Sequence, residues 1–246
     1  MLPAALAALL DRPDTERVLD VGGWAAPVNR ADWVLDVMPH ATRGALMPGG
    51  FGPGPERFGP DTWVTRDMCD PEPWPWDDGY FDFAICTFTL EDVRDPVRVC
   101  AEMARVARAG YIEVPSVLDE LSHRNPEASG GPWLGHSHHR WLCLREDDTL
   151  VFLHKAHSLH TRRSVRVPGR WARRLGPEER VLAHAWTGTL RAREYPAIDH
   201  YPFARLEAEI AQRFSPGPAE RAGIALADRA RNSVEWRLRR RAEQRG

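Results

Sequence analysis

The sequence predicts an α/β fold, in which a mostly parallel seven-stranded sheet has flanking helices and an antiparallel hairpin at its edge. Three observations lead to this prediction. Short apolar runs bounded by Gly, Pro and Asp recur from residue 17 onward, a pattern typical of buried strands. A helical segment separates two of these runs, and a strand, helix, strand unit joins parallel strands. The chain has 246 residues, which is long enough for one well-buried core.

Five of the apolar runs are expected to form the parallel strands. They lie at residues 17–21, 33–37, 63–65, 81–86 and 111–114. Before the last of them, Asp95 and Pro96 form a helix start, with an N-cap residue followed by proline in the first turn. Apolar residues then follow at helical spacing until Gly110 ends the segment. This helix predicts the parallel crossover.

The remaining elements lie at the two ends and in one hairpin. Residues 141–144 and 150–153 flank a polar turn and predict the antiparallel hairpin. An apolar helix is expected over residues 1–10, ahead of the first strand. We expect a first domain over residues 1–160, followed by an extension over 161–246. The extension is expected to hold a strand at 181–190 and arginine-rich helices near 202–214 and 218–244.

Composition narrows the classes of partner and compartment. The net charge of −2 gives no global attraction to nucleic acid or anionic membranes, so neither is expected as a partner. No apolar stretch approaches the roughly 20 residues of a membrane-spanning helix. The four cysteines are widely spaced, without a Cys-x-x-Cys pair, and the first residues lack a basic leader. We therefore expect a cytoplasmic protein. The sequence predicts no oligomeric state.

The chemistry is expected where the strands end, because ligands of open α/β sheets bind beyond the carboxyl ends of the strands. Gly22 and Gly23 follow the first strand and would allow a ligand to approach the backbone. Asp36 ends the second strand, where a carboxylate can accept hydrogen bonds from both hydroxyls of a ribose. Asp67 and Met68 follow the third strand and could accept from an adenine amino group and pack on the ring. This order predicts a cofactor that contains a nucleoside.

The type of cofactor follows from the missing helix after the glycines. A pyrophosphate needs the N-terminus of such a helix. Only nine residues, 24–32, separate the glycines from the second strand, and Pro27 interrupts them. A cofactor without phosphates, such as S-adenosylmethionine, is favoured.

Residues 74–92, WPWDDGYFDFAICTFTLED, carry a family resemblance. They resemble the fourth motif region of class I methyltransferases of the type 11 branch, which has a proline-aromatic-proline-Asp run, a Phe-Asp pair and a Leu-Glu dipeptide. The resemblance continues through Arg94, Asp95 and Pro96 to residues 110–116, and it spans roughly residues 17–155. It implies a Rossmann-like fold and S-adenosylmethionine as cofactor.

The resemblance also implies roles for individual residues. Asp20, Gly22 and Gly23 would line the methionine and ribose part of the cofactor, Asp36 the ribose, Asp67 and Met68 the adenine, and Thr87 the region of the sulfonium. The chain departs from the family where it has Trp24 and Ala26 in place of repeated glycine. A Gly- and Pro-rich loop over residues 38–60 replaces the usual second helix, and such a loop is a lid, a binding surface or disorder.

A histidine-rich segment precedes the hairpin, on the side where the acceptor is expected. His138 and His139 are candidate general bases for an acceptor hydroxyl, or loop histidines that orient the hairpin. Arg140 could hold an anionic group of the substrate, and Trp141 could also contact it. The histidines, among them His136, raise the alternative of a metal, but their spacing is not that of a zinc site, so none is expected.

These observations predict methyl transfer from S-adenosylmethionine to a small-molecule oxygen, nitrogen or carbon. The acceptor itself cannot be identified from the sequence. Two alternatives stay open: a non-catalytic binding module that keeps the fold, and a metal-dependent hydrolase that uses the histidine cluster.

Overall fold

The computed structural model describes residues 1–122, 134–161, 165–167, 169–197 and 203–214. By contacts between Cα atoms the chain divides into two compact units, Met1–Phe203 and Ala204–Gly246. The sheets and the candidate site lie in the first unit. The predicted helix over 218–244 lies outside the described residues.

The central sheet has the predicted mostly parallel character, which confirms the α/β class. Its order is β3-β2-β1-β4-β5-β8. Five strands are parallel: β1 (Val18–Val21), β2 (Trp33–Asp36), β3 (Trp63–Thr65), β4 (Phe83–Thr87) and β5 (Ala109–Pro115). The sixth, β8 (Val181–Thr187), is antiparallel to β5 over seven residue pairs. The predicted count of seven strands differs from the six that this sheet has within the described residues.

The predicted hairpin forms, but not at the edge of the central sheet. Its strands β6 (Trp141–Glu146) and β7 (Thr149–His154) are joined through Asp147, whose φ of 51° is left-handed. Together with β9 (Arg191–Glu194) they form a separate three-stranded sheet. The edge beside β5 is taken by β8, so the hairpin cannot pair there. The strand expected at 181–190 is shorter in the structure: β8 ends at Thr187, a turn follows at Gly188, and β9 begins at Arg191.

The described part of the first unit contains six α-helices. They are α1 (Pro3–Leu10), α2 (Pro96–Val106), α3 (Val117–Glu120), α5 (His157–Thr161), α6 (Gly169–Ala172) and α7 (Pro177–Arg180), with 3-10 turns η1 (His40–Thr42) and η2 (Pro60–Thr62). In the second unit α8 (Phe203–Arg213) carries Leu206 and Ile210 at helical spacing. The Asp95 carboxylate caps α2 as expected, because it accepts from the Arg98 N–H at 2.9 Å. None of the described helices is long and apolar enough to cross a membrane.

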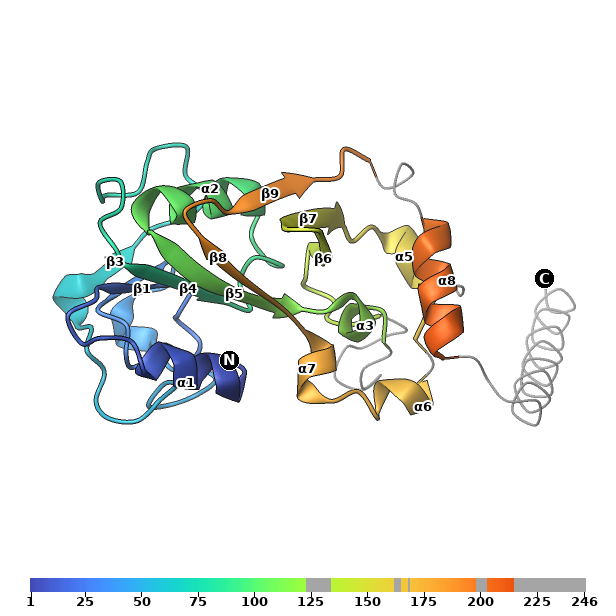
Figure 1. Cartoon of the computed structure of the whole chain (residues 1–246), viewed down its shortest axis with the longest axis horizontal. Coiled ribbons are helices and arrows are strands. Elements are labelled where there is room, and N and C mark those ends of the chain that lie inside the picture. The colour runs from blue at the N-terminus through green and yellow to red at the C-terminus, as the bar shows by residue number, and fades with distance from the viewer. Residues whose placement is uncertain (123–133, 162–164, 168, 198–202, 215–246) are drawn as a thin grey trace, which may run out of the picture. The chain divides into compact units, whose positions relative to one another are not determined.

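The two faces of the central sheet are covered differently. Figure 1 shows α2 on one face and α1 on the other. On the α2 face, Leu19, Phe81 and Met103 belong to the larger core cluster. On the opposite face, Val34 packs in a smaller cluster with Leu9 of α1. Loops complete that smaller cluster, because no helix connects β1 to β2, as predicted, or β2 to β3.

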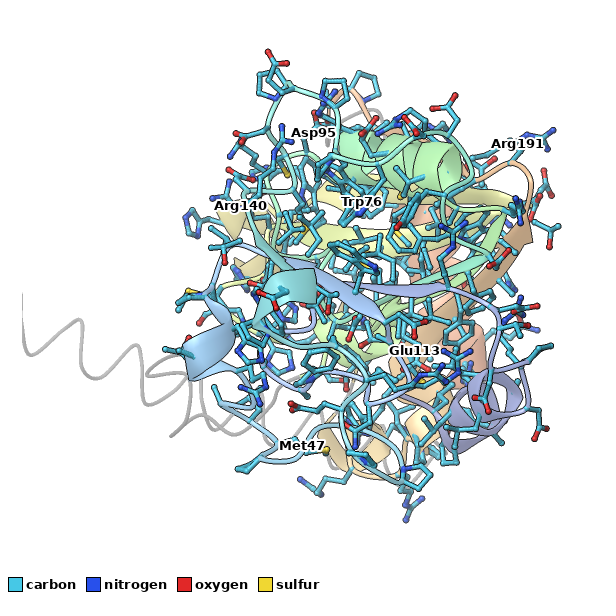
Figure 2. The ribbon with its side chains drawn as sticks, turned by 90° about the vertical axis from the view of Figure 1, so that its left-hand side faces the viewer. Met47, Trp76, Asp95, Glu113, Arg140 and Arg191 are labelled. Atoms are coloured by element: carbon cyan, nitrogen blue, oxygen red, sulfur yellow. The ribbon has the colours of Figure 1, made fainter. Side chains whose placement is uncertain are left out.

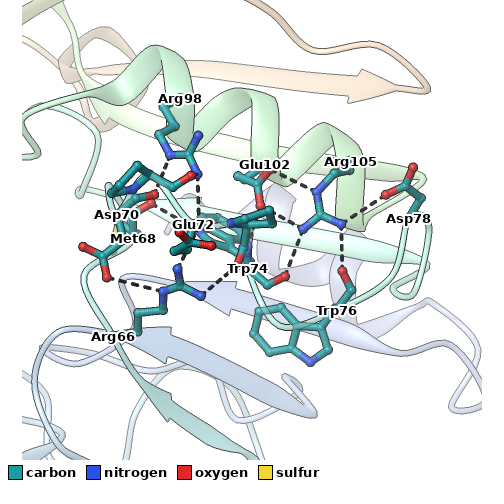
Figure 3. Close-up of polar contacts among 12 residues, drawn as sticks. Arg66, Met68, Asp70, Glu72, Trp74, Trp76, Asp78, Arg98, Glu102 and Arg105 are labelled. Carbon is teal, nitrogen blue, oxygen red and sulfur yellow. Dashed lines mark hydrogen bonds and ion pairs between the residues drawn. The ribbon is translucent and has the colours of Figure 1, made fainter.

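Three arginines fix the loop between β3 and β4, which carries the motif of the predicted family (Figure 3). Arg98 and Arg66 donate to backbone carbonyls of residues 70–73 at 2.6–3.0 Å. Arg105 donates to the carbonyls of Trp74 and Trp76 and pairs with Glu102 and Asp78. We call residues 66–78 with Arg98, Glu102 and Arg105 the arginine clamp. Its polar groups hold the loop to α2.

Candidate functional site

A cavity of about 970 Å³ opens at the carboxyl ends of the parallel strands. Its walls come from the tips of β1, β2, β4 and β5, the histidine-rich segment and residues near α3 and α7. Lining residues include Gly22, Trp24, Asp36, Val37, Leu46, Met68, Phe88, Thr89, Glu91, Asp92, Glu113, Asp119, His136, His138, His139 and Arg180. Of the residues predicted for the site, the cavity brings together Gly22, Asp36, Met68, His138 and His139. Asp20, Gly23, Asp67, Thr87, Arg140 and Trp141 are not among the lining residues.

The Asp36 carboxylate is held rigidly at the cavity wall. One of its oxygens accepts from the Trp24 N–H at 3.0 Å, and the other accepts from the Met38 N–H at 2.8 Å. Asp36 is 6 % exposed, and this burial raises its pKa above the ordinary value, although the backbone donors oppose the rise. Each carboxylate oxygen has further lone-pair capacity. Asp36 can therefore accept hydrogen bonds from a ligand in the cavity.

The turn at Gly22 and Gly23 leaves less room for a ligand than two glycines in the sequence suggest. Gly22 has φ of +81°, and a Cβ placed there would lie 2.2 Å from the Thr89 hydroxyl oxygen. A Cβ on Gly23 would lie 2.5 Å from a carboxylate oxygen of Asp20. The space that glycine leaves free is therefore filled by the chain's own side chains. A ligand can reach Gly22 only from the cavity side.

Asp20 is a buried scaffold residue in this structure. It is 2 % exposed, and its carboxylate accepts from the Val28 N–H at 2.9 Å, which holds the loop after β1. Burial raises the pKa of Asp20 to about 7, an effect only partly offset by that hydrogen bond. Its predicted contact with a cofactor stays a prediction.

Of the residues predicted to contact adenine or the sulfonium, only Met68 is among the lining residues of the cavity. Met68 lines it and is 5 % exposed. Asp67 forms an ion pair with Arg94 and accepts from the Cys69 N–H at 2.8 Å. Although partial burial raises the pKa of the Asp67 carboxyl, these two partners lower it below the ordinary value. Thr87 ends β4 outside the set of lining residues. An adenine contact by Asp67 and a sulfonium contact by Thr87 stay predictions.

The cavity also has exposed apolar residues that the sequence reasoning missed. Val37 is 60 % exposed, Leu46 83 % and Phe88 44 %. Phe88 adopts φ of 54°, a left-handed conformation that is unfavourable for a bulky residue. Met47 lies nearby in the chain and at the periphery of the molecule in Figure 2. For Val37, its position directly after Asp36 was the signal in the sequence that could have placed it at the site.

Several residues that line this cavity have a buried carboxylate oxygen without a hydrogen-bond donor among the described residues. They are Glu91, Asp92 and Glu113. For Glu113 the N-terminal ammonium of Met1 lies 3.6 Å from that oxygen, and the other oxygen accepts from the Leu2 N–H at 2.7 Å. Burial raises the pKa of Glu91 well above its ordinary value. Arg180 is paired with Asp119 at 2.7 Å, and a positively charged ligand group in the cavity would favour the ionised forms of the nearby carboxyl groups.

Three imidazoles come together on the cavity wall. His136 and His139 stack with ring centroids 4.5 Å apart, and His138 meets the His139 ring edge-on at 4.5 Å. Arg140 is exposed. Trp141 is 7 % exposed, and its ring N–H donates to the Val93 carbonyl at 2.8 Å. Their predicted substrate contacts are thus not part of this arrangement and stay predictions.

A buried carboxylate that the sequence reasoning missed holds His139. Glu120 is fully buried, and one oxygen lies 2.6 Å from Nδ1 of His139. Its other oxygen pairs with Lys155, the only lysine of the chain, which also donates to the His136 carbonyl at 2.8 Å. Burial alone raises the pKa of the Glu120 carboxyl, but His139 and Lys155 together lower it. Nδ1 of His139 is therefore occupied, and Nε2 is the nitrogen left for the cavity.

Comparison with known proteins identifies part of the chain. Residues 56–112 match a family model described as a methyltransferase domain, and this match confirms the resemblance to the type 11 branch. No curated protein matches the chain.

Several solved structures also match over part of the chain. A complex of the Trm112 methyltransferase activator with a methyltransferase from Haloferax volcanii is 19 % identical, covering 46 % of this chain and 51 % of that one, with a TM-score of 0.33. An S-adenosylmethionine-dependent methyltransferase from Mesorhizobium loti is 20 % identical, covering 48 % and 56 %, with a TM-score of 0.32. The alignments span about half the length of these chains. We therefore base the function on the family match and on this chain's own residues.

Proposed function

We propose that the chain transfers a methyl group from S-adenosylmethionine to a small-molecule oxygen, nitrogen or carbon acceptor. The family match over residues 56–112 supports methyl transfer in general. The observation that carries the finer proposal is Asp36, a carboxylate fixed by two backbone N–H groups at the wall of a large cavity. Each oxygen keeps a lone pair with which we propose that it accepts from a ribose hydroxyl.

The rest of the cavity fits the cofactor in size and chemistry. Its volume of about 970 Å³ is at the upper end of the range of small-molecule sites. Val37, Met68 and Phe88 offer apolar surface for an adenine ring. The unpartnered oxygens of Glu91 and Asp92 suit the positive charges of a sulfonium and an amino group.

When bound, S-adenosylmethionine supplies an electrophilic methyl group on its sulfonium. The residues of this chain would hold that group in line with the acceptor, and such positioning can supply most of the rate acceleration. His138 and His139 lie on the wall proposed for the acceptor. His139 is oriented by Glu120, so that Nε2 is the ring nitrogen available to accept a proton in the metal-free protein.

Two further parts of the proposal concern the domain boundary and the cellular location. We place the methyltransferase domain within residues 1–160, with 161–246 as its extension, and we propose a cytoplasmic location. β8 comes from the extension and supplies the antiparallel strand of the central sheet. Proteolysis that releases a folded fragment ending near residue 160 would support the boundary.

Calorimetric titration with S-adenosylmethionine tests the proposal. We expect one binding site per chain, and Asp36→Ala should weaken binding at least 100-fold, because it removes the acceptor for the ribose. Asp61→Ala is the matched control, since Asp61 is an exposed acid in η2 and does not line the cavity. Equal affinities of the wild-type protein and Asp36→Ala would contradict the placement of the ribose.

A non-catalytic binding module is the second candidate, favoured by the Thr89 side chain that fills the space beside Gly22. It predicts that the wild-type protein takes up no S-adenosylmethionine in the same titration. The Thr89→Ala variant distinguishes a cofactor site that the Thr89 side chain blocks from the absence of any cofactor site. If the hydroxyl blocks the cofactor, this variant gains binding that the wild-type protein lacks.

A further inference from the structure

We propose that His136, His138 and His139 form a binding site for one divalent transition metal ion, open toward the cavity. One ring nitrogen from each histidine can be chosen so that all three lie within 4.8 Å of one another. The sequence spacing of these residues did not predict a metal. A metal site is supported by the proximity of the three histidines in the folded chain and by the contacts of His139.

The distances are close to those of a three-histidine site. Tetrahedral zinc with Zn–N bonds of about 2.0–2.1 Å places its ligand nitrogens about 3.4 Å apart. The imidazoles must therefore approach by about 1.5 Å at most. His138 is exposed, so rotation of its side chain can supply part of the movement. The His136 ring stacks on His139 and would also have to turn, because a bound metal lies in the plane of each imidazole ligand. His139 is 9 % exposed and is the fixed member.

Glu120 gives the fixed member its orientation. A metal-binding histidine commonly donates its second ring N–H to a carboxylate, which sets the tautomer and makes the ligand nitrogen more basic. Nδ1 of His139 lies 2.6 Å from Glu120, which directs Nε2 to the metal. Lys155 balances the Glu120 charge and also donates to the His136 carbonyl, so one buried network ties the two ends of the segment together.

The electrostatics of the cavity favour a cation at this place. Glu91 is 1 % exposed, lines the same cavity and has an oxygen without a hydrogen-bond donor among the described residues. Burial, with a smaller contribution from nearby carboxylates that include Glu120, raises the pKa of Glu91, so a cation bound close by would favour its ionised form. Three neutral imidazoles select zinc, copper, nickel or iron over magnesium or calcium, which prefer oxygen ligands.

Such an ion would leave a coordination position open to the cavity. If the proposed methyl transfer holds, an acceptor hydroxyl bound there would lose its proton more easily, because a metal lowers the pKa of a bound oxygen acid. This consequence rests on the proposed function, whereas metal binding itself does not. The metal would occupy Nε2 of His139, so direct proton acceptance by that nitrogen belongs to the metal-free protein only.

Metal binding can be measured on protein purified without a histidine tag and stripped with a chelator. We expect Zn²⁺ titration by calorimetry to give one site per chain. Co²⁺ should give visible absorption bands with the intensity of tetrahedral coordination. His138→Ala should weaken Zn²⁺ binding at least 100-fold, and its exposed position makes a folding defect unexpected. His154→Ala is the control, since His154 is an exposed histidine of β7 outside the cluster.

Glu120→Gln tests the orientation of His139. Loss of a partner of this kind typically weakens metal binding 10- to 100-fold, and circular dichroism reports whether the variant folds. Zn²⁺ binding below a tenth of an equivalent, or equal binding by the wild-type protein and His138→Ala, would overturn the proposal. Calorimetry with S-adenosylmethionine on the stripped protein is read separately, so failure of the proposed methyl transfer is distinguishable from failure of the metal site.

Discussion

The arginine clamp and the cavity differ in how their polar groups are satisfied. In the clamp, the guanidinium of Arg105 meets two backbone carbonyls and two carboxylates (Figure 3). In the cavity, buried oxygens of Glu91 and Asp92 have no donor among the described residues. Buried polar groups are normally paired, because leaving one unpaired costs about 1–3 kcal/mol.

This difference separates residues that hold the fold from residues that await a ligand. The family motif at 74–92 contributes to both regions. Its first residues, 74–78, belong to the clamp, and its last part supplies Phe88, Glu91 and Asp92 to the lining of the cavity. The motif therefore joins a segment that holds the fold to residues of the candidate site.

The largest expected effect is on the clamp. Arg105→Ala should lower the free energy of unfolding by about 3 kcal/mol, because it leaves Glu102 and two carbonyls without their partner. Arg108→Ala is the matched control, since that guanidinium is 66 % exposed and its pair with Asp82 should contribute less than about 1 kcal/mol. Chemical denaturation measures both. Equal losses would remove the distinction between the clamp and an ordinary surface ion pair.

The second largest expected effect is a pH dependence of the free energy of unfolding, which Asp20 should cause. Burial raises its pKa from 3.8 to about 7 in the folded protein. Between those values the folded chain holds a proton that the unfolded chain has lost. The stabilisation is complete below about pH 4 and is lost as the pH rises to about 7.

Asp20→Asn removes this titration and keeps an oxygen for the Val28 N–H. Relative to the wild-type protein, the variant should gain on the order of 2 kcal/mol between pH 5.5 and pH 8. Denaturation curves at the two pH values measure the gain. A difference that does not change with pH would mean that Asp20 is ionised throughout.

The smallest expected effect is that of a substitution at Asp67 on cofactor affinity. Its carboxylate is committed to Arg94 and to the Cys69 N–H, and it does not line the cavity. Asp67→Ala should change the affinity for S-adenosylmethionine less than about threefold, well under 1.4 kcal/mol. A loss as large as that of Asp36→Ala would support the adenine contact inferred from the sequence.

Much of the fold followed from local patterns. The five parallel strands, the helix after Asp95 and the hairpin were predictable because apolar runs and capping residues mark them locally. The position of the hairpin was not, because it depends on β8 occupying the edge beside β5. Pairing between segments 70 residues apart leaves no pattern within either one.

The candidate site was predictable to a similar degree. Asp36 and Met68 reach the cavity because they follow strands whose ends share one edge. Glu120 was not predictable, since 19 residues separate it from His139 and only the fold brings them together. The filling of the space beside Gly22 by Thr89 is likewise a contact between distant residues.

Ultraviolet cross-linking of methyl-labelled S-adenosylmethionine, followed by tryptic peptide mapping, tests most directly whether the cavity is the cofactor site. Residues 31–43 form one tryptic peptide that contains Asp36 and Val37. We expect label in that peptide, and we expect excess unlabelled cofactor to prevent it. Labelling confined to peptides that contribute nothing to the cavity, or no labelling that unlabelled cofactor suppresses, would contradict the account.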